Sequence, residues 1–128
     1  MSIHGIGTDR VVMSRIASSP ERIGVRVMCR VRNEPRTGQG QVKGSSPRRL
    51  AMLFAAKEAA SKALGTGFRH GITMRDIETI HQSSGKPEIK LHGAAAKLAA
   101  EMGITTVHLS LTDDDGIAMA FAIAELGH

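Results

Sequence analysis

The fold is organised around the stretch Phe54-Ala-Ala-Lys57-Glu58-Ala-Ala-Ser61-Lys62-Ala-Leu64-Gly65-Thr66-Gly67. Alanine dominates this stretch, and no glycine or proline interrupts it before Gly65, so it predicts the second half of a helix. Pro47 suits the first turn of that helix, and Ser45 or Ser46 can serve as its N-cap. Gly65 predicts that the helix ends there with a left-handed C-cap.

One face of this predicted helix carries Glu58, Ser61 and Lys62, which lie within an arc of about 100°. Ala51 and Ala55 lie beside them, and their small side chains leave room for something to approach. The alternative is that Glu58 and Lys62 form an ordinary surface ion pair, worth about 0.3 kcal/mol. The opposite, leucine-rich face carries a second lysine, Lys57, for which we predict a structural or interface role.

The chain has 128 residues, which is enough for one domain with a core, and 41% of them are apolar. No apolar run reaches the roughly 18 residues of a membrane span, and the N-terminus lacks a secretory signal pattern. The single cysteine, Cys29, cannot form an internal disulfide. We therefore expect a cytoplasmic protein without a membrane partner.

The net charge of +5 predicts anionic partners. Nucleic acid is one class of such partner, but the chain has three phenylalanines and neither tyrosine nor tryptophan, so it lacks an aromatic platform for single strands. A phosphorylated small molecule or an acidic protein accounts for the charge equally well.

The N-terminal residues 3–8 predict a brief buried strand, in which Gly5 and Gly7 permit close backbone approach. Asp9 follows this strand. Its carboxylate could serve chemistry at the end of a strand, or it could cap a helix over residues 10–18. The next segments carry arginines that are either solvated helix surface or a receiving surface for an acidic partner: Arg15, Arg22 and Arg26. Residues 30–47 contain many glycines and prolines and predict a long mobile loop.

The C-terminal half predicts a strand over residues 74–81, a turn through Lys86 and Pro87, and a returning strand over 88–91. A second helix is predicted over 93–102, followed by a hairpin over 104–111 and from 117 onward. In the last strand, Ile117, Met119, Phe121 and Ile123 alternate with alanines. We expect the bulky face to lie in the core and the alanine face to admit a helix or another subunit. The predicted class is α+β, a small single domain over residues 1–128 whose mostly antiparallel sheet packs against the long alanine-rich helix.

The sequence contains no zinc-binding cluster, no P-loop and no dinucleotide-binding glycine motif. Its candidate chemistry is a pair of carboxylates, Asp9 and Glu58, with Lys62 one helical turn beyond Glu58. Mg²⁺ is typically held by one or two carboxylates together with phosphate oxygens of a substrate. A neighbouring lysine can offset the charge of a leaving group in phosphoryl transfer.

The order and spacing of four segments resemble those of holo-acyl-carrier-protein synthases. The segments are Gly5-Ile6-Gly7-Thr8-Asp9, the stretch Phe54–Gly67, Gly85-Lys86-Pro87 and His108-Leu-Ser110-Leu-Thr-Asp113. The resemblance extends over residues 3–125. It implies a 4′-phosphopantetheinyl transferase, which moves the phosphopantetheine arm of coenzyme A to a serine of apo acyl carrier protein, releases 3′,5′-ADP and supports fatty acid biosynthesis.

The resemblance also implies roles for individual residues. Asp9 and Glu58 would hold Mg²⁺, and Lys62 would contact the pyrophosphate and assist the leaving group. The general base is left open between Asp9 and a water molecule. The residues that would line the coenzyme A site are Ser61, Lys62, Gly65, Thr66, Gly67, Lys86 and Pro87. The carrier protein would be received by Arg15, Arg22 and Arg26. Members of the family form homotrimers with sites at subunit boundaries.

Two departures from the family pattern concern substrate contacts. Leu53 stands where members usually carry arginine, so Arg48 or Arg49 could supply that contact instead. Asp113 stands where many members have histidine. Two alternatives therefore remain beside an active transferase. One is a degenerate transferase that turns over poorly, and the other is a non-catalytic basic module that binds an acidic protein or nucleic acid.

Overall fold

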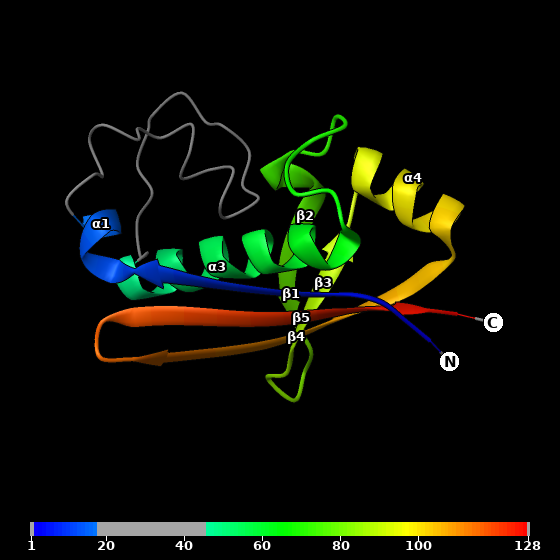
Figure 1. Cartoon of the computed structure of the whole chain (residues 1–128). Helices are drawn as coiled ribbons and strands as arrows, with labels where there is room; N and C mark the ends of the chain where they lie inside the picture. Colours follow the sequence, from blue (N-terminus) through cyan, green and yellow to red (C-terminus); the bar gives the residue numbers. More distant parts are fainter. Residues whose placement is uncertain (1, 18–45, 128) are drawn as a thin grey trace, which may run out of the picture.

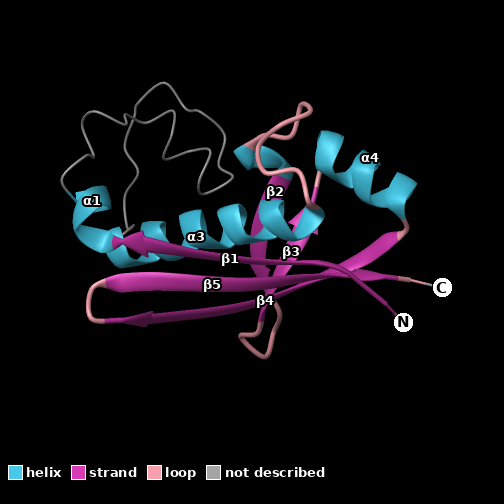
Figure 2. Cartoon of the chain, in the orientation of Figure 1, coloured by secondary structure: helices cyan, strands magenta, loops and turns pink. Residues whose placement is uncertain are grey.

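The computed structural model describes residues 2–17 and 46–127. They form a five-stranded antiparallel sheet in the order β1-β5-β4-β3-β2, with one long helix lying along it (Figures 1 and 2). This confirms the predicted α+β class. The strands are β1 (Ser2–Val12), β2 (Ile77–His81), β3 (Pro87–Leu91), β4 (Ile104–Asp114) and β5 (Ile117–Leu126). The helices are α1 (Met13–Ala17), α3 (Pro47–Leu64), the 3-10 turn η1 (Met74–Asp76) and α4 (Gly93–Met102).

Both ends of α3 are capped as the sequence predicts. The hydroxyl of Ser46 accepts a hydrogen bond from the amide of Arg49 at 3.1 Å, and Pro47 occupies the first turn. Gly65 ends the helix in the left-handed region with φ of 88°. The last residues of the predicted loop 30–47 therefore begin α3, whereas residues 30–45 lie outside the described part of the chain.

The closest contact between helix and sheet lies where α3 crosses β1. A methyl carbon added at Gly7 would lie only 1.9 Å from the carbonyl oxygen of Ala59, and one added at Gly5 would lie 2.3 Å from that of Ala63. Both glycines are needed because the backbones touch. This confirms the predicted close backbone approach.

The expected orientation of β5 is half right. Its alanines do face the helix, and Ala118, Ala120, Ala122 and Ala124 are at most 4% exposed. The bulky face, predicted to form the core, instead points away from α3, and Met119 and Phe121 are 49% and 47% exposed. The reason is that α3 presents alanines of its own, so the two backbones pack too closely to leave space for large side chains.

β1 differs from the brief buried strand that was predicted. It has 11 residues and continues to Val12, and the side chains of Ile3 and Ile6 are 59% and 55% exposed. Since α1 begins only at Met13, Asp9 lies within the strand and does not cap a helix. That alternative role for Asp9 is therefore wrong.

The C-terminal half follows the prediction with small shifts of boundary. The strand expected from Met74 begins as the 3-10 turn η1 and becomes β2 at Ile77. α4 and its stop at Gly103, with φ of 78°, are confirmed. β4 extends to Asp114, so the turn of the last hairpin narrows to Asp115 and Gly116, both with positive φ. No helix within the described residues is long and apolar enough to cross a membrane.

Candidate functional site

Asp9 and Lys62 meet where the middle of β1 passes over α3. The Nζ of Lys62 lies 3.2 Å from Oδ1 of Asp9 and donates a second hydrogen bond, of 3.0 Å, to the carbonyl oxygen of Thr8. Asp9 shares its face of β1 with Gly5 and Gly7, the residues that touch α3, because side chains alternate along a strand. Lys62 thus forms an ion pair with a residue of β1, and its contacts extend beyond its own helix.

Glu58 lies close enough to Asp9 and Lys62 for their charges to shift its pKa. Partial burial raises the pKa of Glu58, the negative charge of Asp9 raises it further, and the ammonium of Lys62 opposes both effects. The two carboxylates therefore repel each other and share one ammonium group.

Such a pair fits a hard divalent cation, whose preferred ligands are carboxylate oxygens. Within the described residues no group of three or more His, Cys, Asp or Glu side chains is arranged around a possible metal position. Asp9 and Glu58 could thus supply part of a ligand set, with the remaining ligands coming from a substrate or water.

A shallow cleft of about 420 Å³ extends from this pair across the outer face of the sheet. Asp9 and Lys62 line one end of it, and the outward-facing Ser110, Met119 and Phe121 line the remainder. The charged pair is therefore open to solvent and adjoins an exposed apolar surface.

Ser61 does not share the open face of Glu58 and Lys62, contrary to the sequence-based expectation. Its side chain is fully buried, and its hydroxyl donates a 2.7 Å hydrogen bond to the carbonyl oxygen of Glu58. Its main-chain carbonyl instead organises the glycine turn, accepting hydrogen bonds from the amides of Thr66 and Gly67 at 3.3 and 3.1 Å. A ligand of this turn would meet Gly67, which has open space beside it.

The other predicted site residues are not gathered with Lys62 within one chain. Lys86 ends the β2–β3 hairpin turn and Pro87 begins β3; this turn projects from the side of the sheet opposite α3 (Figure 1). Arg15 lies on α1 and is exposed. Arg22 and Arg26 lie outside the described residues.

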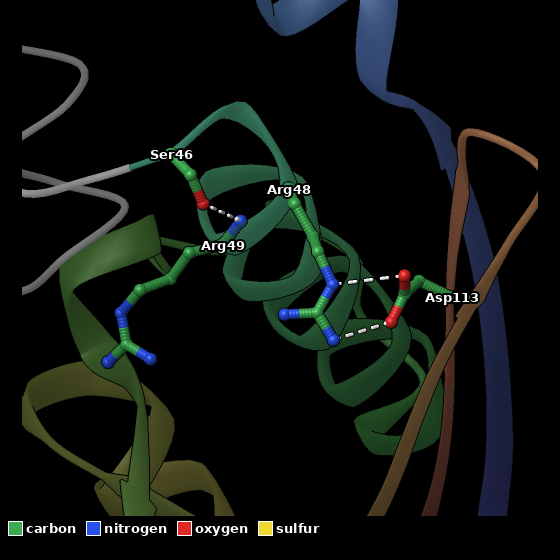
Figure 3. Close-up of polar contacts among 4 residues, drawn as sticks. All are labelled: Ser46, Arg48, Arg49 and Asp113. Atoms are coloured by element: carbon green, nitrogen blue, oxygen red, sulfur yellow. Dashed lines mark hydrogen bonds and ion pairs between the residues drawn. The ribbon is translucent and has the colours of Figure 1, made fainter.

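An ion pair that the sequence does not signal joins the start of α3 to the end of β4 (Figure 3). Arg48 donates two hydrogen bonds to the carboxylate of Asp113, at 3.0 and 2.7 Å. The guanidinium lowers the pKa of Asp113, and the carboxylate raises the pKa of Arg48. Arg49 extends in another direction in the same view. Arg48 and Arg49 are the two residues that could supply the arginine contact missing at Leu53. Of these, Arg48 is already paired with Asp113.

Leu53 is 8% exposed and forms a small apolar cluster with Leu50, to which Phe54 and Met74 add partly buried surface. Leu53, which replaces the arginine usual in the family, thus has apolar neighbours that suit a leucine. An arginine introduced here would have to displace them or extend past them.

Lys57 is fully buried, whereas Lys62 is half exposed, which confirms that the two lysines lie on different faces of α3. Its ammonium donates a 2.7 Å hydrogen bond to the carbonyl oxygen of Met74 and a second hydrogen bond to that of Ile77. Burial lowers the pKa of Lys57 to about 8, with a smaller opposing effect from the charge of Glu78.

This pKa predicts a stability change at alkaline pH. The unfolded chain holds the Lys57 proton up to its ordinary pKa of 10.5, whereas the folded chain releases it near 8. Because the unfolded state binds more protons between these values, the contribution of Lys57 to the free energy of unfolding should rise across that window by roughly 3 kcal/mol. Urea unfolding from pH 7.5 to 10.5 checks this. The rise should be present in the wild type and in Lys90→Met, and smaller in Lys57→Met.

Comparisons with known proteins place this chain among carrier-protein synthases. The family model described as the 4′-phosphopantetheinyl transferase superfamily matches residues 5–122. A holo-[acyl-carrier-protein] synthase of Halorhodospira halophila is 44% identical over 125 residues, covering 98% of this chain and 99% of that protein. Its counterpart in Edwardsiella ictaluri is 45% identical with the same coverage.

Solved structures agree with these relatives. The crystal structure of holo-[acyl-carrier-protein] synthase from Neisseria meningitidis superposes with a TM-score of 0.81 at 37% identity, covering 97% of this chain and 99% of that one. The Helicobacter pylori synthase, solved in complex with coenzyme A, superposes with a TM-score of 0.76 at 25% identity, covering 94% and 99%.

Proposed function

Because this chain belongs to the 4′-phosphopantetheinyl transferase superfamily, we propose that it transfers the 4′-phosphopantetheine group of coenzyme A to a serine of an apo acyl carrier protein. The full-length similarity to named synthases identifies the reaction. The observation that carries the chemistry is the meeting of Asp9, Glu58 and Lys62 at the β1–α3 contact.

In this reaction the serine oxygen attacks the phosphorus next to pantetheine. A new phosphorus–oxygen bond forms to the carrier, the pyrophosphate bond breaks, and 3′,5′-ADP leaves while the serine proton passes to a base. Lys62 is half exposed and its Nζ already lies beside Asp9, so it can bind a pyrophosphate oxygen and offset the charge that develops on the leaving group.

We assign Asp9 and Glu58 as the residues that hold Mg²⁺. Bound there with the pyrophosphate, the ion would neutralise phosphate charge and hold the reacting groups in line. The assignment is supported by the mutual repulsion of the two carboxylates, which a divalent cation relieves. The glycine turn 65–67 would receive the donor beside them.

We further propose that the protein acts as a homotrimer with sites at subunit boundaries. The outer face of the sheet exposes Ile3, Ile6, Met119 and Phe121, which are 47–59% exposed, and this surface is continuous with the cleft at Lys62. An apolar surface of this kind marks a protein interface. A neighbouring copy seated on it could bring its own Lys86 and Pro87 to the site, since one chain does not gather them with Lys62.

Phe121→Glu should therefore dissociate the oligomer. A carboxylate on this face would be buried without a partner in the assembly, which costs several kcal/mol per interface. Analytical ultracentrifugation should show a trimer for the wild type and a monomer for the variant, with transfer activity lost alongside. Met102→Glu changes a residue of similar exposure on α4 and should leave the trimer intact. A monomeric wild type, or a Phe121→Glu variant that remains trimeric, contradicts the assignment.

The carrier protein is the acidic partner that the net charge of +5 accommodates, and Arg15, Arg22 and Arg26 are the proposed receiving residues. We place the reaction in the cytoplasm and in fatty acid biosynthesis, where acyl carrier protein is used.

Release of nucleotide separates this function from the alternative of a basic binding module. With coenzyme A, Mg²⁺ and apo acyl carrier protein, the enzyme should release 3′,5′-ADP, which chromatography detects, and omission of the carrier should abolish the release. A binding module would bind the carrier in a strongly salt-dependent way and release no nucleotide. That outcome would overturn the proposed function.

A further inference from the structure

Lys57 is the largest fully buried side chain in the described part of the molecule. Filling the core does not require a lysine, because methionine has a similar length and no charge to desolvate. The distinguishing feature of the lysine is its ammonium group, which reaches two main-chain oxygens at once. The effect of Lys57 therefore depends on the segment to which those two oxygens belong.

The two acceptors are the carbonyl groups of Met74 and Ile77, which bracket η1 at its start and at the first residue of β2. Lys57 thus ties the middle of α3 to the segment 74–77. The same segment is anchored on its other side by a hydrogen bond of 2.8 Å from the amide of His92 to the carbonyl of Asp76.

This segment ends the loop that begins at the glycine turn 65–67. At its beginning, the loop is held by the amides of Thr66 and Gly67 on the carbonyl of Ser61. At its end, the loop is held by Lys57, which lies about one helical turn before Ser61 on α3. Between the two anchors, Ile72 is buried in the core and Phe68 packs against it only in part. The loop therefore spans between two fixed points on one helix.

A cleft of about 490 Å³ opens beside this loop, lined by Phe68, Thr73, Met74 and Arg75. Phe68 directly follows the turn, whereas Met74 and Arg75 belong to the segment held by Lys57 and Thr73 immediately precedes it. The width of the cleft thus depends on the position of η1 relative to α3, and the hydrogen bonds that Lys57 donates help to set that position.

We propose that Lys57 is a positioning residue for coenzyme A: by holding Met74–Ile77 against α3, it keeps the loop after the glycine turn and its cleft in the shape that receives the donor. This inference rests on the proposed function, because the turn binds coenzyme A only in that account. Lys57 does not touch the reacting atoms, which lie on the opposite face of the helix with Lys62. Its loss should accordingly weaken donor binding more than it slows the chemical step.

The test compares Lys57→Met with the wild type at a temperature where circular dichroism shows both proteins fully folded. The KM for coenzyme A should rise about tenfold or more, with kcat within about threefold of the wild-type value, and titration calorimetry should show the same loss of affinity. Lys97→Met, a change of an exposed lysine on α4, should leave both constants unchanged. A purely structural role would lower thermal stability without this split.

A second variant serves if Lys57→Met does not fold. Lys57→Gln retains an N–H donor but is too short to reach both carbonyls together, so its KM for coenzyme A should rise by a smaller factor. An unchanged KM in either folded variant, beside an active wild type, overturns the positioning role alone. A wild type that neither binds coenzyme A nor transfers its arm overturns the proposed function, and this inference with it.

Discussion

Replacing either carboxylate of the candidate metal pair should abolish transfer. Asp9→Asn and Glu58→Gln each keep the size of the side chain but remove the negative charge that, in the proposed function, would hold Mg²⁺ against the pyrophosphate. We expect kcat/KM for coenzyme A to fall by about a thousandfold in each variant, the loss typical of removing one well-placed electrostatic group. The measurement is the initial rate of holo-carrier formation at saturating Mg²⁺.

Stability measurements separate this loss from misfolding. Burial and the charge of Asp9 raise the pKa of Glu58, so its ionised form destabilises the metal-free protein above the ordinary pKa of a glutamate. Glu58→Gln should therefore raise the melting temperature at pH 7 without Mg²⁺, and any stabilisation by Mg²⁺ with coenzyme A should shrink. Glu101→Gln, on the exposed side of α4, is the matched control and should keep full activity. Full activity in Asp9→Asn or Glu58→Gln would remove the metal assignment.

The second large effect is expected at Gly7. Its added methyl carbon in Gly7→Ala would lie within 3 Å of the carbonyl oxygen and carbon of Ala59 and of the amide nitrogen of Ala63, all of them helix backbone. Backbone atoms cannot rotate away, so α3 must move off β1. We expect a loss of about 3 kcal/mol or more in the free energy of unfolding.

Urea unfolding measures this loss, and Thr8→Ala is the control, because its exposed side chain lies on the outer face of the same strand. Gly7→Ala should also lower activity even where it is folded, since Asp9 and Lys62 meet across the displaced contact. If Gly7→Ala is as stable as Thr8→Ala, the close packing of β1 on α3 is contradicted.

The helices could be predicted from the sequence because their signals are local. Pro47 and Gly65 mark the ends of α3 within the residues that form it, and Gly103 does the same for α4. The close approach at Gly7 was also predictable, since a glycine inside a strand is typical of backbone contact.

The orientation of β5 could not be predicted from its own residues. Alternation shows that Ala120 and Phe121 face opposite sides, but it does not say which side meets the helix. That choice is made by the alanines of α3, a partner distant in the sequence. Bulky residues usually form the core, but here the alanines of α3 and β5 pack together. The bulky face of β5 therefore lies on the outer surface of the sheet.

The candidate site was reached only in part from the sequence. The spacing of Glu58 and Lys62 places them on one helix face, but it was the family resemblance that joined them to Asp9. Spacing also put Ser61 on that face, whereas its short side chain turns inward to bond the carbonyl of Glu58. Arg48 and Asp113 are 65 positions apart in the chain, and no pattern in a single sequence indicates that they form an ion pair.

The mass of the carrier protein tests the central claim most directly. Purified protein is incubated with coenzyme A, Mg²⁺ and several apo acyl carrier proteins, and intact carrier mass is recorded by mass spectrometry over time. We predict that at least one carrier gains the mass of a single phosphopantetheine group, and that a variant of that carrier with its acceptor serine replaced by alanine gains none. Carriers that all remain unmodified, while a reference synthase modifies the same preparations, would contradict the account.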